Sequence, residues 1–241
     1  MRNLIIELRK NKRSGAIPVL ILTGMIGALY AYANFAIRKE TLLSLPLPPM
    51  VILLTQLYGM IMVLNLFGII VSTTIIFGIE HQRNSIKKMY MLPIKISSIY
   101  MTKFIILFLL LFLCIAVQSL SLTVIGRLYL PEGTFEAGGV LVFAVYSFIT
   151  SLPVLSFMLL VSSRAENLWI TLGIGVVGFL SGMAMASTKH LVLLLNPFVL
   201  IMRPAMSASI TPSIPITVLS IVSSIVLIIA GYISATKFHY E

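Results

Sequence analysis

The sequence predicts an all-α integral membrane protein with six transmembrane helices. Hydrophobic residues make up 59% of the 241 residues and charged residues only 10%, against roughly 25% charged residues in soluble domains. The apolar residues gather in runs of about 20 or more, the length that crosses a hydrocarbon core of about 30 Å. The net charge of +10 comes from basic residues that flank these runs, which indicates membrane topology and contact with anionic lipid rather than nucleic acid.

The six predicted spans follow one another along the whole chain. They cover residues 16–37, 50–79, 104–125, 138–162, 168–187 and 214–235. The second run would be about 45 Å long as a helix at about 1.5 Å per residue, so it must tilt or continue beyond the bilayer. The segment 191–202 is too short to span and contains Asn196-Pro197, which favours a re-entrant or interfacial element between helices five and six.

The basic residues predict the orientation of these spans. With the N-terminus in the cytoplasm, the external side holds five of the 17 basic residues: Arg38, Lys39, Arg127, Lys189 and Arg203. The cytoplasmic side holds all the others: Arg2, Arg9, Lys10, Lys12, Arg13, Arg83, Lys87, Lys88, Lys95, Lys103, Arg164 and Lys237. The positive-inside rule therefore predicts two cytoplasmic termini, a cytoplasmic loop at 80–95 and an external loop at 188–213.

Residues 1–13 are expected to form a short interfacial helix ahead of the first span. Leu4, Ile5 and Leu8 fall on one side at helical spacing, and four basic residues follow that can contact lipid phosphates. A plain basic flank is the alternative. A cleaved signal peptide ending at Ala31-Tyr32-Ala33 is disfavoured, because cleavage would leave five helices and spoil the charge bias.

The pattern of polar residues excludes several classes of function. The chain has no aspartate, its seven acidic residues lie at span ends or in loops, and its three histidines lie in separate regions, so no metal site is readable. Ion-driven carriers generally need ionisable groups near the membrane centre, although a sodium site of hydroxyls and carbonyls stays open. A G-x-x-x-x-G-K-[ST] phosphate loop is also missing from the sequence. We therefore expect a non-enzymatic chain without a cofactor of its own, which receives energy from a partner.

A few polar side chains lie inside the predicted spans. Gln56 and Asn65 in the second span and Gln118 in the third are candidates to line a translocation path. The alternative, which we favour, is hydrogen bonding between helices, worth about 0.6 kcal/mol on average. The fifth span carries a stripe of small residues, Gly175, Gly178, Gly182 and Ala186, which favours packing within the subunit over a dimer seam.

The charged segment 80–95 between spans two and three is the most informative part of the chain. Residues 85–91 can form a short amphipathic helix that ends before Leu92-Pro93. Ile86, Met89 and Tyr90 share one face of it, with basic residues elsewhere. Such a helix can dock into a groove on a soluble partner. The alternative is a basic loop that faces lipid.

Along this segment and into the next span stand Glu80, Ser85, Ile86, Lys87-Lys88, Leu92-Pro93-Ile94-Lys95 and Lys103. This pattern resembles the first cytoplasmic loop of type-2 ABC exporter permeases. In that family a glutamate ends the second helix, a Gly-Thr-like pair opens a coupling helix, and a Leu-Pro-hydrophobic-basic motif leads into helix three. The acidic-then-basic segment 7–14 is similar to the family's interfacial helix, whereas Asn84-Ser85 departs from the usual Gly-Thr.

The resemblance implies a role and a set of partners. The chain would be a permease subunit driven by a separate cytosolic ATPase dimer that binds ATP and Mg²⁺, paired with a second permease that is identical or related. The residues implied to couple it to the ATPase are Glu80, Arg83, Ser85, Ile86, Lys87, Lys88, Met89, Leu92 and Pro93.

In size, the chain is similar to the permeases with which lantibiotic-producing bacteria protect themselves. That similarity implies export of an amphipathic antimicrobial peptide from the bacterial cytoplasmic membrane. Export of another amphipathic compound is one alternative. A membrane scaffold or sensor that transports nothing, and whose basic segment only binds lipid, is the other.

Overall fold

The computed structural model describes residues 15–81, 96–131, 133–187, 190, 192–206 and 212–237. The regular elements of these residues are all helices, and six of them are long and apolar enough to cross a membrane, as the sequence predicts. The long helices are α2 (Ala16–Leu43), α4 (Tyr58–His81), α6 (Ile96–Tyr129), α7 (Ala137–Arg164), α8 (Leu168–Met185) and α10 (Ile214–Lys237). The short ones are α3 (Pro49–Val51), η1 (Ile52–Gln56), η3 (Leu193–Leu195) and α9 (Pro197–Met206). The interfacial helix expected at 1–13 lies outside the described residues.

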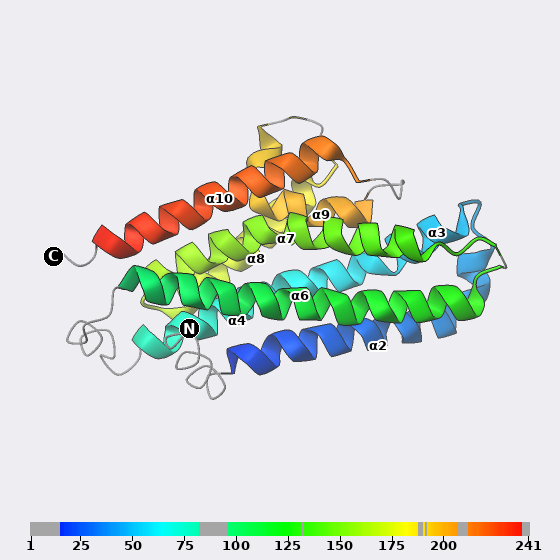
Figure 1. Ribbon diagram of the computed structural model, residues 1–241, viewed down its shortest axis with the longest axis horizontal. Helices are drawn as coiled ribbons and strands as arrows, with labels where there is room; N and C mark the ends of the chain where they lie inside the picture. The colour runs from blue at the N-terminus through cyan, green and yellow to red at the C-terminus, as the bar shows by residue number, and fades with distance from the viewer. Residues whose placement is uncertain are drawn as a thin grey trace.

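Helices α4 and α7 form the centre of the bundle (Figure 1). In an 18-residue apolar stretch of each span, 67% of the residues are buried in the span that contains α4 and 56% in α7, against 17% in α10. Helix α2 packs on α4 and α6, α8 packs on α4 and α9, and α10 packs on α7. The first turn of α2 and the last turn of α10 lie at the same end of the bundle, as an even number of spans requires.

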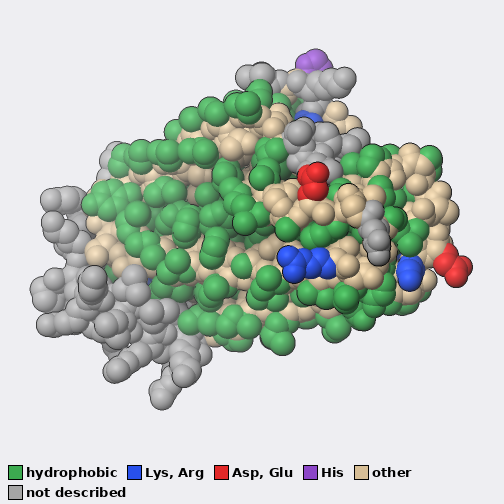
Figure 2. All heavy atoms as spheres, turned by 45° about the vertical axis from the view of Figure 1, so that its right-hand side comes forward, with side chains coloured by type: hydrophobic (Ala, Val, Ile, Leu, Met, Phe, Trp, Pro, Cys, Tyr) green, Lys and Arg blue, Asp and Glu red, His purple; other side chains and the backbone are tan. Residues whose placement is uncertain are grey.

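The outer surface of the bundle is apolar (Figure 2). Leu29, Leu120 and Val177 are each more than 60% exposed and belong to three different helices. A water-soluble protein rarely exposes apolar surface on this scale, whereas hydrocarbon is the matching solvent for it. The structure therefore has the character of a multi-pass membrane protein.

The second predicted span is not one uninterrupted α-helix. In the structure it begins at Pro49, one residue before the predicted start, continues through α3 and the π-helical η1, and becomes regular only at Tyr58. Thr55 Oγ1 donates a hydrogen bond to the carbonyl of Val51 at 2.7 Å within this irregular stretch. The π-helical η1 lies at the end of this span that is remote from residues 80–95. π-Helical turns are rare in proteins, and those that occur are often found at functional sites.

The third span is longer than its apolar run, because α6 begins at Ile96 rather than at residue 104. The added turns contain hydroxyl side chains that a hydropathy pattern scores as a loop. They are accommodated in the helix; Thr102 Oγ1, for example, donates to the carbonyl of Ser98 at 2.8 Å. This extension places Lys103 inside α6 instead of ahead of it.

The segment predicted to be re-entrant or interfacial forms η3 and α9. With 10 residues, α9 is about 15 Å long and too short to cross a bilayer. Asn196 caps it by accepting a hydrogen bond from the Phe198 N–H at 3.0 Å, and donates from its own amide to Ser181 Oγ of α8 at 3.1 Å. Six of its residues are buried, so α9 is held inside the bundle rather than on its surface.

The small residues of α8 pack against other helices of the same chain, as favoured from the sequence. Gly175 faces Ile70 of α4, and Gly178 lies under the ring of Phe198. A Cβ atom at Gly182 would lie 2.8 Å from the backbone carbonyl oxygen of Phe198. These close approaches allow α9 to enter the bundle beside α8.

We expect Gly182→Ala to destabilise the protein, because the added methyl group must displace backbone. Overpacking of this kind typically costs about 1–3 kcal/mol, which is measurable as a lower midpoint of thermal unfolding in detergent. Gly173→Ala is the matched control, since nothing lies within 4 Å of a Cβ atom at that position of the same helix. Equal midpoints for the two variants would contradict the α8–α9 packing described here.

Candidate functional site: the connector foot and the central amide pair

The predicted ATPase-coupling residues lie at or beyond the end of α4. Residues 82–95, here named the connector, join α4 to α6. The backbone of Glu80 belongs to the last turn of α4. The other coupling residues lie outside the described residues: Arg83, Ser85, Ile86, Lys87, Lys88, Met89, Leu92 and Pro93. The structure thus describes the two helix ends between which the connector lies, the end of α4 and the start of α6. We call these two helix ends the base of the connector.

Lys103 of α6 joins the two helices at this base. We name its contact with Ile76 and Phe77 of α4 the connector foot. The side chain of Lys103 is fully buried, and Nζ donates a hydrogen bond to the backbone carbonyl of Ile76 at 2.6 Å. Nζ also lies 4.3 Å from the centroid of the Phe77 ring. A charged donor makes a stronger bond than a neutral one, and the aromatic face adds a cation–π attraction. The start of α6 is therefore pinned to the last turns of α4.

Two further helices contact the connector foot. The hydroxyl end of Tyr100 in α6 packs directly on Gly231 of α10, where a side chain would collide with it. Leu168, the first residue of α8, packs in the same way on Gly78 of α4. Closely packed side chains transmit displacement instead of absorbing it. A movement of the connector would therefore be passed to four of the long helices.

A second polar contact joins α4 and α6 inside the second and third spans. Asn65 Nδ2 donates to Gln118 Oε1 at 2.9 Å, and Gln118 Nε2 donates to Asn65 Oδ1 at 2.7 Å. The two side chains are 0% and 1% exposed. We name this contact the central amide pair. The thiol of Cys114, one turn before Gln118, lies 3.4 Å from Asn65 Oδ1.

Helix α2 closes over the central amide pair. A Cβ atom at Gly27 would lie 2.5 Å from Gln118 Nε2, so only glycine leaves room for the amide. Gln118 Nε2 also lies 3.5 Å from the carbonyl oxygen of Thr23, and Ser121 Oγ of α6 donates to the carbonyl of Ala28 at 2.9 Å. The first three spans are therefore joined through one buried polar cluster.

Two of the three predicted pathway residues thus meet each other, and the third does not meet them. Gln56 lies on η1 and is exposed. The reciprocal bonds of Asn65 and Gln118 favour the interpretation that these residues hold helices together. The interpretation that they line a path stays a prediction.

The sequence pattern did not predict that Lys103 joins α4 and α6. The pattern placed it at the opening of a span as one basic residue among many on the cytoplasmic side. The signal that could have identified it is its position between Met101 and Phe104, since a lysine inside an apolar helical stretch must find acceptors within the protein. Over the described parts of the chain, no group of His, Cys, Asp and Glu side chains could hold a metal ion.

The central amide pair predicts non-additive effects of mutation. Asn65→Leu or Gln118→Leu alone should lower the free energy of unfolding by about 1–3 kcal/mol, because the remaining amide loses its partner in an apolar interior. The double variant should cost less than the sum of the two. A coupling of about 0.6–1.7 kcal/mol, the range for hydrogen bonds in membrane proteins, is measurable by reversible unfolding in mixed micelles.

Asn34→Leu is the control for this cycle, since Asn34 bonds to the Tyr30 hydroxyl within its own helix. It should show no coupling to Gln118→Leu. Additive costs of Asn65→Leu and Gln118→Leu would show that the amides do not interact as described.

The chain matches one protein family over more than half of its length. The model of the ABC-2 family of transporter proteins matches residues 3–182, which include the connector, the connector foot and the central amide pair. No curated protein and no solved structure matches the chain. Six membrane-spanning helices and this match together identify a transport subunit, and an ABC permease implies a partner ATPase. The chain belongs to the ABC-2 transporter family as a membrane permease.

Proposed function

We propose that this permease exports an amphipathic antimicrobial peptide of the lantibiotic type, out of or off the bacterial cytoplasmic membrane. Energy comes from a separate cytosolic ATPase dimer that binds ATP and Mg²⁺ and docks on residues 80–95. A second permease, identical or related, completes the membrane part. Family membership supports transport, and the overall similarity in length and span number supports the peptide class.

The observation that carries the coupling mechanism is the fully buried Lys103 at the connector foot. An ATPase that closes on ATP pushes on the connector from the cytosol. The bond from Lys103 to Ile76 keeps the ends of α4 and α6 together during this push. The central amide pair, farther along the same helices, makes them move as one unit with α2.

The surface of the bundle supports a substrate that is itself dissolved in the membrane. The described spans expose apolar side chains on α2, α8 and α10, and each of these helices has less than a third of its span buried. A peptide inserted in the lipid can approach such a surface sideways, without entering water. An amphipathic peptide fits this route better than a small hydrophilic solute.

The segment 80–95, which holds the predicted coupling residues, predicts a coupling phenotype. Glu80→Ala combined with Lys87→Glu and Lys88→Glu should abolish protection of cells exposed to a lantibiotic, because the reversed charges repel the surface that the ATPase presents. The measurements are survival of cells that express the whole complex and co-purification of the ATPase from their membranes. Survival should return to that of cells without the permease.

The matched control reverses two charges at the opposite end of the bundle, with Arg38→Glu and Lys39→Glu. It should leave ATPase association unchanged. Full protection and normal ATPase association in the connector variant would refute docking at 80–95. A wild-type chain that never co-purifies with an ATPase would favour the scaffold or sensor. Protection against unrelated amphipathic compounds but not lantibiotics would correct the substrate class.

The connector foot predicts a separate effect on coupling. Lys103→Met keeps the length and apolar stem of the side chain but cannot donate to Ile76. We expect the ATPase to remain bound while transport falls by about fivefold or more, the effect of about 1 kcal/mol of lost coupling. The readout is peptide transport per ATP hydrolysed in reconstituted vesicles.

Lys39→Met is the control for Lys103→Met, because Lys39 Nζ also lies over an aromatic ring, 5.1 Å from the centroid of Tyr129. That lysine is at the end of the bundle away from the connector. An unchanged transport-to-hydrolysis ratio in Lys103→Met would show that the foot does not transmit the movement.

A further inference from the structure

A hollow lies between α6 and α7 on the side of the bundle away from the connector. Its volume is about 380 Å³, within the range of small-molecule sites, about 300–1,000 Å³. It is lined by residues of α6 between Phe112 and Thr123 and residues of α7 between Ala137 and Phe148. Both stretches belong to membrane-spanning helices, so the hollow, here named the α6–α7 groove, opens within the bilayer.

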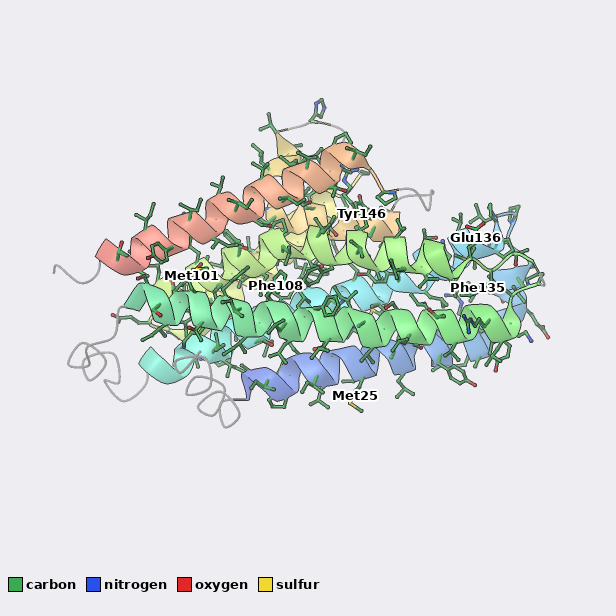
Figure 3. The ribbon with its side chains drawn as sticks, in the orientation of Figure 1. Met25, Met101, Phe108, Phe135, Glu136 and Tyr146 are labelled. Atoms are coloured by element: carbon green, nitrogen blue, oxygen red, sulfur yellow. The ribbon has the colours of Figure 1, made fainter. Side chains whose placement is uncertain are left out.

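Aromatic side chains pack at both ends of the groove, near the labelled residues Phe108 and Phe135 (Figure 3). Phe148 of α7 packs edge-on against Phe108 and Phe112 of α6, with ring centroids 5.0 and 5.7 Å apart. At the other end, the ring of Phe135 packs directly on Gly126. Between these contacts the facing residues include Ala116, Ser119, Ala137 and Ala144, which are too small to fill the space.

The lining of the groove is apolar in effect. Ser119 Oγ donates to the carbonyl of Ala116 at 2.9 Å, and Thr123 Oγ1 donates to the carbonyl of Ser119 at 2.8 Å. Each hydroxyl thus uses its proton within α6. Leu120 and Leu141 at the rim are 64% and 66% exposed, so the groove is open sideways toward lipid. Its occupant must therefore be hydrocarbon that enters from the membrane.

The length and charge of the groove identify that occupant. From Phe112 to Thr123 the helix rises about 16 Å at about 1.5 Å per residue, which is half of a hydrocarbon core of about 30 Å. One leaflet has this depth. Arg127 follows Thr123 by one turn on the same face of α6, is exposed, and lies where the phosphates of that leaflet begin.

We propose that the α6–α7 groove binds one acyl chain of a phospholipid from the external leaflet, with the phosphate of that lipid on Arg127. The leaflet follows from the charge bias, which places this end of the bundle outside. Glu136 at the start of α7 is exposed at the same level and repels a second negative charge. The site therefore takes a phosphodiester and does not require an additional anionic headgroup.

The test uses the full-length chain in nanodiscs that contain phosphatidylglycerol or phosphatidylcholine with a photoreactive group on one acyl chain. After irradiation, mass spectrometry of peptides locates the attached lipid. We expect labelling of 112–123 and 137–148 several times above that of the exposed face of α8, with both headgroups. Labelling no higher than that of α8 would mean that the groove holds only exchanging boundary lipid, and would overturn the proposal.

Variants make the test specific. Ala144→Phe should fill the groove and reduce its labelling to the level of α8, and Ser119→Leu should act in the same way if Ala144→Phe fails to accumulate. Arg127→Gln should weaken retention by about fivefold, the effect of removing about 1 kcal/mol of attraction between one basic residue and lipid phosphate. If neither filling variant accumulates, the labelling pattern of the wild-type chain decides.

Ala33→Phe and Arg38→Gln are the matched controls, since both residues are exposed on α2 in the same half of the bundle. Neither should change groove labelling. An equal loss in the controls would overturn the proposal. So would protein-to-protein cross-links at 112–123 in place of lipid, because they would show that the groove belongs to a subunit interface. Wild-type labelling with phosphatidylglycerol alone would contradict the stated headgroup tolerance.

Discussion

The central amide pair is the contact on which the arrangement of the first three spans depends. An amide side chain without a partner in an apolar interior costs several kcal/mol, so Asn65 and Gln118 are stable there only while each faces the other. Their facing positions set the relative height of α4 and α6. Gly27 then lets α2 approach the same point closely enough to cover the pair. A slip of any one helix along its axis would expose unsatisfied donors and acceptors.

Lys103 adds a second attachment between α4 and α6, and two attachments have a consequence that one does not. Asn65 and Ile76 are separated by about 16 Å along α4 at about 1.5 Å per residue. Two helices joined at two separated points cannot rotate about either contact without breaking the other. A force applied where α4 and α6 meet at the connector foot would therefore be carried along both helices together. The irregular η1, beyond the central amide pair, is the part of this span where the regular hydrogen-bond pattern already changes.

The sequence was sufficient for the features that depend on composition and length. Six apolar runs, a short element in the segment 191–202 (observed as η3 and α9) and close packing at Gly178 and Gly182 all follow from spacing and residue size. The predicted start of the third span, residue 104, lies about two turns after the observed start of α6. Hydropathy cannot distinguish hydroxyls that bond to helix carbonyls from hydroxyls in a loop. The hydrogen-bond partners of Asn65 and Lys103 could not be predicted from the sequence either. Such contacts join residues 53 and 27 positions apart, and their pairing depends on which helix faces meet in three dimensions.

Small residues have opposite effects in two parts of this bundle, and the difference lies in the large residues beside them. On α8, glycines face the backbone and ring of Phe198, so helix α9 packs closely against α8 and fills the space. Between α6 and α7, small residues face one another, and the ring contacts of Phe148 with Phe108 and Phe112 space the two helices at one end of this stretch. In water such a hollow between exposed apolar side chains would favour collapse. In a membrane, lipid chains can fill it at no cost in hydration, so the same sequence feature becomes a binding groove.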